Sequence, residues 1–283
     1  MTDAKNNKSK LYDKTSTTLL TLALLVIGLL YLFPLIWFVL SSFKPGSELF
    51  AYPLTIFPES PTTANYIEAW NSLDFVKYFA NTTLSAVITT ILTIIASATC
   101  GFAFAKYDSK WLGFFFVCII ATTMLPTEVI MNPVFTVIRK LGLYDSLAGI
   151  IIPSINTATG IFMFRTFFVS VPDDLIESAR IDGASDGRIF MSIMLPIAKP
   201  IIMTLAIFSF QWRWNDYIWP LIVLNDPKKY TFQVAIRSLV GAENINWTVL
   251  IAASVLSILP LLLVFVVFQR YILDSGATSG LKD

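Results

Sequence analysis

Side chains that could do chemistry are scarce in this chain of 283 residues, which has two cysteines and no histidine. The lack of histidine excludes Ser-His and Cys-His catalysis, histidine-ligated metal and a histidine pH switch. Residues 183–187 match the G-x-S-x-G pattern, but a nucleophile elbow needs a histidine partner and a strand–turn–helix context. No G-x-x-x-x-G-K-[ST] stretch occurs, so ATP binding through a P-loop is not expected. Cys100 and Cys118 lie in apolar runs, where a free cysteine behaves as a small buried apolar residue.

An ionisable pair, Arg213 and Asp216, interrupts the otherwise apolar run of residues 201–225. Residues three apart share a face of a helix, so these two charges can neutralise each other. Ionisable groups at membrane depth usually face a bundle interior or water. Two interpretations stay open: a polar lining of a translocation path, or an internal ion pair beside an aromatic belt at the membrane interface.

The densest group of charges lies between Pro172 and Pro196, a segment that we call the charged loop. Pro172 followed by two acids, Asp173 and Asp174, is typical of a helix start, because proline fits the first turn and acids stabilise the positive end of the helix dipole. Gly183 can end this first helix or permit a close contact.

The first helix of the charged loop is predicted to be amphipathic. One face is apolar and the other is charged: Leu175, Ile176 and Ala179 against Asp174, Glu177 and Arg180. Either Ser185 or Asp186 can cap a second helix. We therefore predict two short helices, joined at a glycine, on the inner membrane surface. Such a hairpin either anchors the loop in lipid or docks on a soluble protein, and the pattern fits both.

The elements that must position these residues are membrane helices. The chain is 55% hydrophobic and 14% charged, whereas a soluble domain carries about 25% charged residues. Long charge-poor runs of roughly 20 residues account for the deficit and indicate membrane spans. We predict an all-α polytopic membrane protein with six transmembrane helices, at residues 15–43, 78–105, 111–138, 146–164, 201–225 and 244–269.

These spans divide the chain into five regions: an amino-terminal tail (1–14), a first transmembrane helix (15–43), an extracellular loop (44–77), a five-helix core with the charged loop between helices 4 and 5 (78–273), and a carboxy-terminal tail (274–283). A short helix is expected at Ala64–Ser72. An even number of spans places both tails on one side, and the lysines of the first tail indicate that this side is cytoplasmic. The first span has no clear cleavage site and is expected to be retained.

The charged loop resembles a motif of a known protein family. Glu177-Ser178-Ala179, Asp182-Gly183 and Ile193-Met194-Leu195-Pro196 resemble the EAA signature of permease subunits of binding-protein-dependent ABC importers. Ser178 departs from the usual alanine, which is a change between small residues. Three further motifs resemble the carbohydrate-uptake, MalG-like branch: Ser42–Pro45, Asn65-Tyr66 and Trp214–Pro220. The resemblance covers nearly the whole chain.

This resemblance implies a type I ABC importer permease fold and half of a translocation pathway for a sugar, expected to be an oligosaccharide. The charged loop would be a coupling helix seated in a groove of a cytoplasmic ATPase. The implied coupling residues are Glu177, Ser178, Ala179, Asp182, Gly183, Ile193, Leu195 and Pro196.

The same resemblance implies that the chain is not an enzyme and holds no cofactor or metal, because ATP and Mg²⁺ would bind to the ATPase. The implied partners are a second, non-identical permease subunit, two ATPase subunits, an extracellular solute-binding protein and the sugar, in a bacterial cytoplasmic membrane. No nucleic acid is expected, since the net charge is +1.

The candidate residues of the translocation path are Arg213, Trp214, Asn215, Asp216, Tyr217, Glu128 and Asn132. Aromatic rings near the ion pair, including Trp212 and Trp219, offer flat faces to sugar rings. For Glu128 and Asn132, contact with the partner permease is an equal alternative. Three other functions are weighed: import of another solute such as glycerol phosphate or an amino acid, stand-alone secondary transport, and membrane-embedded catalysis. The chain shows neither an internal repeat nor a convergent acid cluster for the last two.

Overall fold

The structure, a computed structural model, describes residues 2–240 and 245–279, with side chains from 17 to 240 and from 245 to 269. Every element in these ranges is a helix and none is a strand, which confirms the all-α prediction. The chain divides into two compact units, one of residues 1–72 and 243–256 and the other of residues 73–242 and 257–283.

The first unit joins a long apolar helix to a compact polar segment. Its helices are α1 (Thr2–Ser41), α2 (Gly46–Leu49), α3 (Ala64–Ser72) and the first turns of α15 (Trp247–Ser279). Helix α3 has the bounds that the sequence predicts. The apolar part of α1, Thr17–Ser41, is long enough to cross a bilayer, and its most apolar window is not buried within the chain.

The Ser42–Pro45 motif and the Asn65-Tyr66 motif pack on each other in this unit. The amide of Asn65 donates to the carbonyl groups of Ser42 and Lys44, at 2.8 Å each. The hydroxyl groups of Tyr66 and Ser42 lie 2.5 Å apart. Lys44 is 1% exposed, and its ammonium donates to the carbonyl oxygen of Thr55. Both motifs therefore build the polar interior of the segment that follows α1.

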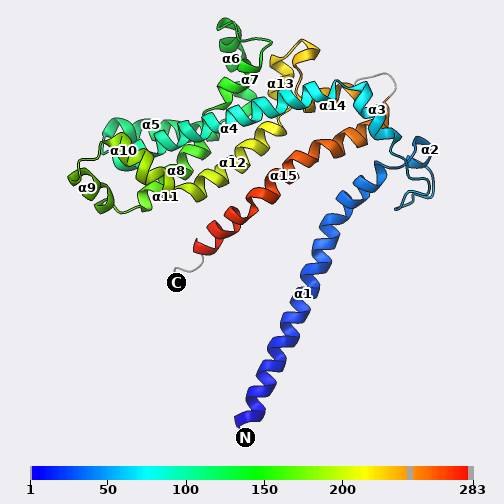
Figure 1. Cartoon of the computed structure of the whole chain (residues 1–283), viewed down its shortest axis with the longest axis horizontal. Coiled ribbons are helices and arrows are strands. Elements are labelled where there is room, and N and C mark those ends of the chain that lie inside the picture. Colours follow the sequence, from blue (N-terminus) through cyan, green and yellow to red (C-terminus); the bar gives the residue numbers. More distant parts are fainter. Residues whose placement is uncertain (1, 241–244, 280–283) are drawn as a thin grey trace. The chain divides into compact units, whose positions relative to one another are not determined.

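The second unit is built around the long helix α4 (Phe75–Lys106), against which α8 (Ala158–Ser170) and α12 (Lys199–Trp214) pack (Figure 1). Glycine permits the close approach of α4 and α8: a Cβ atom on Gly101 would lie 2.5 Å from the Cβ of Phe164. Small residues at such crossings let helix backbones approach in membrane proteins.

Shorter helices complete the second unit. They are α5 (Lys110–Ala121), α6 (Thr127–Lys140), α7 (Leu147–Ile151), α9 (Asp174–Ile181), α10 (Asp186–Ile189), α11 (Leu195–Ile197), α13 (Ile218–Val223) and α14 (Phe232–Val240). Three 3₁₀ turns, Thr122–Met124, Ile152–Ser154 and Pro227–Lys229, and one π-helical turn, Phe190–Met194, lie between them.

Four predicted spans appear as candidate membrane helices, at Thr17–Ser41, Phe75–Lys106, Leu147–Ser170 and Trp247–Gln269. The third predicted span, residues 111–138, is instead bent by 113° between α5 and α6. Pro126 explains the break, because proline has no N–H to donate and disfavours a helical residue before it. Leu125 accordingly has an extended backbone, with φ −88° and ψ 130°.

The fifth predicted span, residues 201–225, is also shorter than expected, because α12 ends at Trp214 and α13 starts only at Ile218. Residues 186–197 and α12 form a second bent pair, at 75°. The described residues thus hold four candidate spans, or up to six if each bent pair is one span.

The predicted ends fall partly outside the described residues: Met1, Asn244 and residues 280–283. Helix α15 runs through Ser279, so residues 274–279 of the predicted tail are helical.

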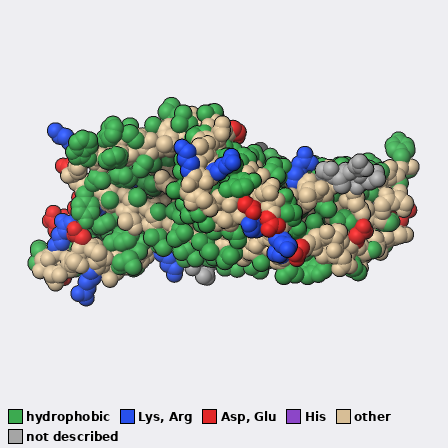
Figure 2. Space-filling model, turned by 90° about the horizontal axis from the view of Figure 1, so that it is seen from above, with side chains coloured by type: hydrophobic (Ala, Val, Ile, Leu, Met, Phe, Trp, Pro, Cys, Tyr) green, Lys and Arg blue, Asp and Glu red, His purple; other side chains and the backbone are tan. Residues whose placement is uncertain are grey.

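The surface is that of a membrane protein. Large apolar side chains of α1 and α15 are more than half exposed, among them Leu24, Leu30, Leu263 and Val266. Hydrophobic and uncharged side chains dominate the face shown in Figure 2, and charged side chains gather in a few places on it. Since a folded soluble chain rarely leaves such continuous apolar surface in water, this chain is a multi-pass membrane protein.

Candidate functional site

The backbone of the charged loop follows the sequence prediction. Helix α9 ends at a turn in which Gly183 has φ +83°, a left-handed conformation that suits glycine. Ser185 caps α10, since its hydroxyl accepts the N–H of Arg188 at 3.4 Å. Asp186, the other candidate cap, is instead the first residue of α10. The loop therefore begins with two short helices joined at a glycine, as predicted, and continues into the π-helical turn Phe190–Met194 and α11.

The charged loop is fixed through an apolar underside. Ile176, Ile189 and Met194 are buried and pack in one cluster with Phe102 and Phe168 of the bundle. Of the predicted coupling residues, Ala179 and Leu195 pack at the edge of this cluster. Ile193 is half-buried and Pro196 is exposed.

The opposite face of the charged loop is open. Glu177, Ser178 and Asp182 are exposed, and the side chain of Ile181 is 85% exposed. Leu175 was predicted to join Ile176 and Ala179 but is also exposed, because a helix turns about 100° per residue and so places Leu175 above Ser178 and Asp182. Sequence reasoning missed this apolar contribution to the exposed face.

A cavity of about 590 Å³ with a mixed polar and apolar wall lies at the break between α12 and α13. Its wall comes from three segments: Thr127, Ile130, Met131 and Val134 of α6; Pro153, Ser154, Asn156 and Thr157 before α8; and Gln211, Trp212, Arg213, Asn215, Asp216 and Trp219 around the break. Asn156 and Gln211 were missed by sequence reasoning. The polar run from Ser154 to Thr157, inside an apolar span, was the available signal for one of these walls.

The predicted pair is formed in the wall of this cavity. Arg213 Nη1 lies 3.5 Å from Asp216 Oδ2, and the two side chains are 23% and 22% exposed. Helix α12 ends between them, so the carboxylate belongs to the break and not to the helix. The two interpretations of the pair are therefore compatible: the charges neutralise each other, and both line a cavity.

Other candidates for the translocation path lie elsewhere. Trp214 is 1% exposed, stacks on Phe210 with ring centroids 5.5 Å apart, and donates to the carbonyl of Ser257 at 2.8 Å. It is part of the core and does not line the cavity. Tyr217 is half-buried and also lies outside the cavity wall. Trp219, by contrast, lines the cavity and donates to the carbonyl of Gly149 at 3.3 Å.

Glu128 and Asn132 are exposed and do not line the cavity. Helix α6 turns Thr127, Met131 and Val134 toward the cavity, and at about 100° per residue the two polar residues fall on another face. This placement leaves an interface with another subunit open to them.

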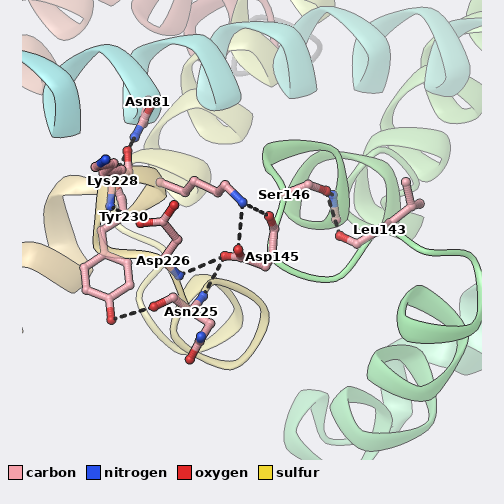
Figure 3. A network of polar contacts seen from close by, with 10 residues as sticks. Asn81, Leu143, Asp145, Ser146, Asn225, Asp226, Lys228 and Tyr230 are labelled. Atoms are coloured by element: carbon pink, nitrogen blue, oxygen red, sulfur yellow. Dashed lines mark hydrogen bonds and ion pairs between the residues drawn. The ribbon is translucent and has the colours of Figure 1, made fainter.

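A network around Asp145 holds the segments next to the cavity together (Figure 3). Asp145 Oδ1 accepts the backbone N–H groups of Asn225 and Asp226, at 2.8 and 3.0 Å. The ammonium of Lys229 donates to the Asp145 carboxylate at 2.7 Å. The hydrogen bond from Lys229, together with these N–H groups, lowers the pKa of Asp145 to about 2. We call this network the Asp145 staple; it joins the turn before α7 to the segment after α13.

No group of three or more His, Cys, Asp or Glu side chains within the described ranges could hold a metal ion.

Comparison with known proteins agrees with this geometry. Residues 97–275 match the family described as "binding-protein-dependent transport system inner membrane component". The chain is 36% identical over 266 residues to the arabinooligosaccharides transport system permease protein AraQ of Bacillus subtilis (strain 168), covering 93% of this chain and 95% of that protein. It is 34% identical over 257 residues to the sn-glycerol-3-phosphate transport system permease protein UgpE of Yersinia pestis, covering 88% and 92%.

A solved structure gives the same fold. It is the crystal structure of a bacterial ABC transporter involved in the import of the acidic polysaccharide alginate, which matches with a TM-score of 0.81 at 26% sequence identity. The match covers 92% of this chain and 97% of that chain. The chain therefore belongs to the family of binding-protein-dependent transport system inner membrane components, the permease subunits of ABC importers.

Proposed function

We propose that this chain forms half of the path by which an ABC importer carries an oligosaccharide across the bacterial cytoplasmic membrane, and that the charged loop couples the path to an ATPase. The observation that carries the proposal is the two-faced charged loop. Its underside is fixed in the bundle by Ile176 and Ile189, and its other face is presented outward.

The exposed face of α9 suits a groove on a soluble subunit. Apolar Leu175 and Ile181 alternate there with Glu177, Ser178 and Asp182. Leu175 and Ile181 are six residues apart, about 120° around the helix, so this face is a mixed apolar and polar surface of the kind that protein interfaces combine. A lipid anchor fits less well, because the two carboxylates on this face would have to leave water.

ATP and Mg²⁺ would bind to two separate ATPase subunits, since the chain has no P-loop sequence. The complex would further contain a second, non-identical permease subunit and an extracellular solute-binding protein. Both termini of this chain would lie in the cytoplasm, on the side of the charged loop.

An oligosaccharide fits the chemistry of the cavity. Trp212, which is 40% exposed, supplies flat aromatic surface, and the amide groups of Gln211 and Asn156 supply directional hydrogen bonds. Ligand sites commonly combine these two features. AraQ, a permease of arabinooligosaccharide transport, supports the same substrate class.

Glycerol phosphate is the second candidate, because UgpE is a relative of similar identity. Phosphate groups are usually held by charge-assisted hydrogen bonds from basic side chains. The basic side chain of the cavity wall, Arg213, is already paired with Asp216. The neutral sugar therefore fits the described wall better.

Purification of the whole complex tests the coupling role. Glu177→Ala combined with Gly183→Pro is expected to abolish co-purification of the ATPase, because it removes an exposed acid and breaks the turn at φ +83°. Glu59→Ala, which changes an exposed acid of the first unit, serves as the control. An ATPase that still co-purifies with the double variant contradicts the coupling role.

A second experiment tests the substrate. The solute-binding protein of the proposed complex is titrated calorimetrically with neutral arabino-oligosaccharides, acidic oligosaccharides and sn-glycerol 3-phosphate. The complex is then assayed for uptake of the best ligand in proteoliposomes. Binding and uptake of glycerol phosphate alone contradicts the oligosaccharide proposal.

A further inference from the structure

The charged loop is tied to the end of α4 at two points, at the beginning of the loop and at the turn between α9 and α10. We infer that Lys106 and Tyr107, the last residue of α4 and the residue that caps it, are positioning residues that make α4 move with the charged loop. This inference rests on the proposed docking of the loop on an ATPase. It names residues outside the EAA-like motif and a helix that is not adjacent to the loop in sequence.

The first tie holds the beginning of the charged loop. The ammonium of Lys106 donates to the carbonyl of Val171 and to Asp173 Oδ1, at 2.6 Å each. The Lys106 side chain is only 5% exposed, whereas that of Asp173 is 76% exposed. A buried ammonium keeps its charge only where acceptors replace its water. Here the acceptors come from the end of α8 and the start of α9, so Lys106 holds these two segments together.

The second tie holds the far end of α9. The Tyr107 hydroxyl donates to Asp186 Oδ2 at 2.8 Å. The other oxygen of this carboxylate, Oδ1, accepts from Arg180 Nη2 at 3.0 Å and from Arg180 Nε at 3.3 Å. Since Arg180 belongs to the last turn of α9 and Asp186 begins α10, Tyr107 contacts both helices through one carboxylate. The two sides of the Gly183 turn are thereby fixed to α4.

Apolar packing alone would not fix the orientation of the loop. The underside residues Ile176 and Ile189 bury apolar surface, and that attraction is not directional. Hydrogen bonds have strict distance and angle requirements. When α9 is displaced, the hydrogen bonds of Lys106 and Tyr107 therefore determine whether the charged loop rotates on the bundle or moves α4 with it.

Helix α4 holds a second set of contacts near its other end. The amide of Asn81 donates to the carbonyls of Lys228 and Tyr230, at 3.2 and 3.1 Å. The hydroxyl of Thr82 accepts the N–H of Phe232 at 2.7 Å. Figure 1 shows α9 and α10 at one end of α4 and α13 and α14 toward the other end. At 1.5 Å per residue, the helix from Asn81 to Lys106 spans about 37 Å.

One continuous helix thus joins the charged loop to the segment that carries the Asp145 staple (Figure 3). The staple holds the segment that follows α13, and Trp219 of α13 lines the cavity. Displacement of the charged loop would therefore reach the cavity through α4 as well as through α8 and α12, which are its neighbours along the chain.

The test uses the complete complex with its binding protein in proteoliposomes, and measures substrate molecules imported per ATP hydrolysed. Tyr107→Phe removes one hydroxyl and keeps the ring that packs on Phe102 at 5.9 Å. Lys106→Met removes the ammonium and keeps an apolar stem. The double variant removes three hydrogen bonds that involve a charged group, each worth about tenfold or more in an equilibrium, so the import ratio is expected to fall at least about tenfold, with the ATPase still bound and active.

Matched controls keep the result specific. Lys110→Met and Tyr52→Phe change an exposed lysine and a tyrosine that is 97% exposed, and both are expected to retain the wild-type ratio. Lys106→Arg retains the charge and is expected to restore most of the ratio. Hydrogen exchange of residues 224–232 gives a second measurement: nucleotide trapping is expected to change it in the wild type and not in the double variant.

The outcomes separate this inference from the proposed function. An unchanged import ratio in the double variant, or loss of the ATPase from the purified complex, overturns the inference, because the ties would then be dispensable or would serve assembly. Absence of ATP-dependent uptake by the wild-type complex overturns the proposed function itself. Uncoupled ATP hydrolysis in the double variant, together with loss of the nucleotide-dependent change in exchange at residues 224–232, supports the inference.

Discussion

The tryptophans near the ion pair differ in burial, and this difference decides which of them belong to the core. Trp214→Ala is expected to lower the free energy of unfolding by about 3–5 kcal/mol, as for other buried aromatic residues, because it leaves a cavity beside Phe79 and Phe210. Trp212 is 40% exposed and lines the cavity, so Trp212→Ala is expected to lower sugar uptake with little loss of stability. Thermal unfolding of the purified complex and uptake in proteoliposomes measure the two effects. Equal losses of stability in both variants would contradict the assignment.

The ionised carboxylate of Asp145 holds the segment after α13. Its pKa is lowered from 3.8 to about 2, so the folded form favours the ionised group. The Asp145 staple should be fully present above about pH 4 and should be lost as the pH falls toward 2. Between pH 5 and pH 8 the staple is expected to be insensitive to pH.

Asp145→Asn tests the staple without acid. The amide keeps the shape of the side chain but cannot pair with the Lys229 ammonium. Amide hydrogen exchange at residues 224–230 is expected to rise several-fold. Asp74→Asn removes an acid of the exposed Asp74–Lys77 pair, whose charged atoms are 4.0 Å apart, and should change exchange there by little. If exchange at 224–230 stays the same in Asp145→Asn, the staple does not hold this segment.

At the scale of elements, glycine permits the turn between α6 and α7 to approach α13. A Cβ atom on Gly149 would meet the carbonyl of Leu143 and would lie 2.9 Å from Val223 Cγ1. Gly149→Ala is therefore expected to lower stability by about 1–3 kcal/mol through overpacking. Gly113→Ala in α5 is the control, because no atom lies within 4 Å of its Cβ position and alanine favours a helix. A thermal unfolding midpoint lowered by both substitutions would contradict the argument.

The elements that the sequence predicts well are those with local signals. Ser185 as a cap, Gly183 in the turn and the bounds of α3 depend on residues close together in the chain. The break before α6 was missed, although Pro126 gives it a cause, because an apolar run of that length satisfies the criterion for a span. Hydropathy depends on the composition of a segment and does not indicate whether the backbone changes direction within it.

Contacts between segments that are distant in the chain could not be predicted from the sequence. Tyr107 and Asp186 are 79 residues apart, and nothing in either neighbourhood indicates that they meet. The wall of the cavity opposite Arg213 likewise depends on how the segment before α8 packs against α12. The sequence predicts which types of residue the site contains. It does not predict which of them meet, because that depends on how the helices pack.

At the scale of the whole molecule, the candidate site is not enclosed by this chain, because the cavity beside Arg213 is open to its surroundings. A stand-alone secondary transporter would enclose its substrate site within its own helices, usually between repeats. The family of this chain and its open site agree in assigning it the role of one subunit.

Reconstitution of the chain alone tests this conclusion. The purified chain in liposomes is expected to show no uptake of oligosaccharide under a sodium or proton gradient, because under the proposed function the path needs a second permease and the charged loop needs an ATPase to move it. Addition of the second permease, the ATPases, the binding protein and internal ATP should restore uptake, and Glu177→Ala in that complex should lower it again. The matched gradient-free liposomes give the background. Uptake by the chain alone that follows the ion gradient and ignores ATP would contradict the subunit role, since it would require a complete path and a driving force within these six or fewer spans.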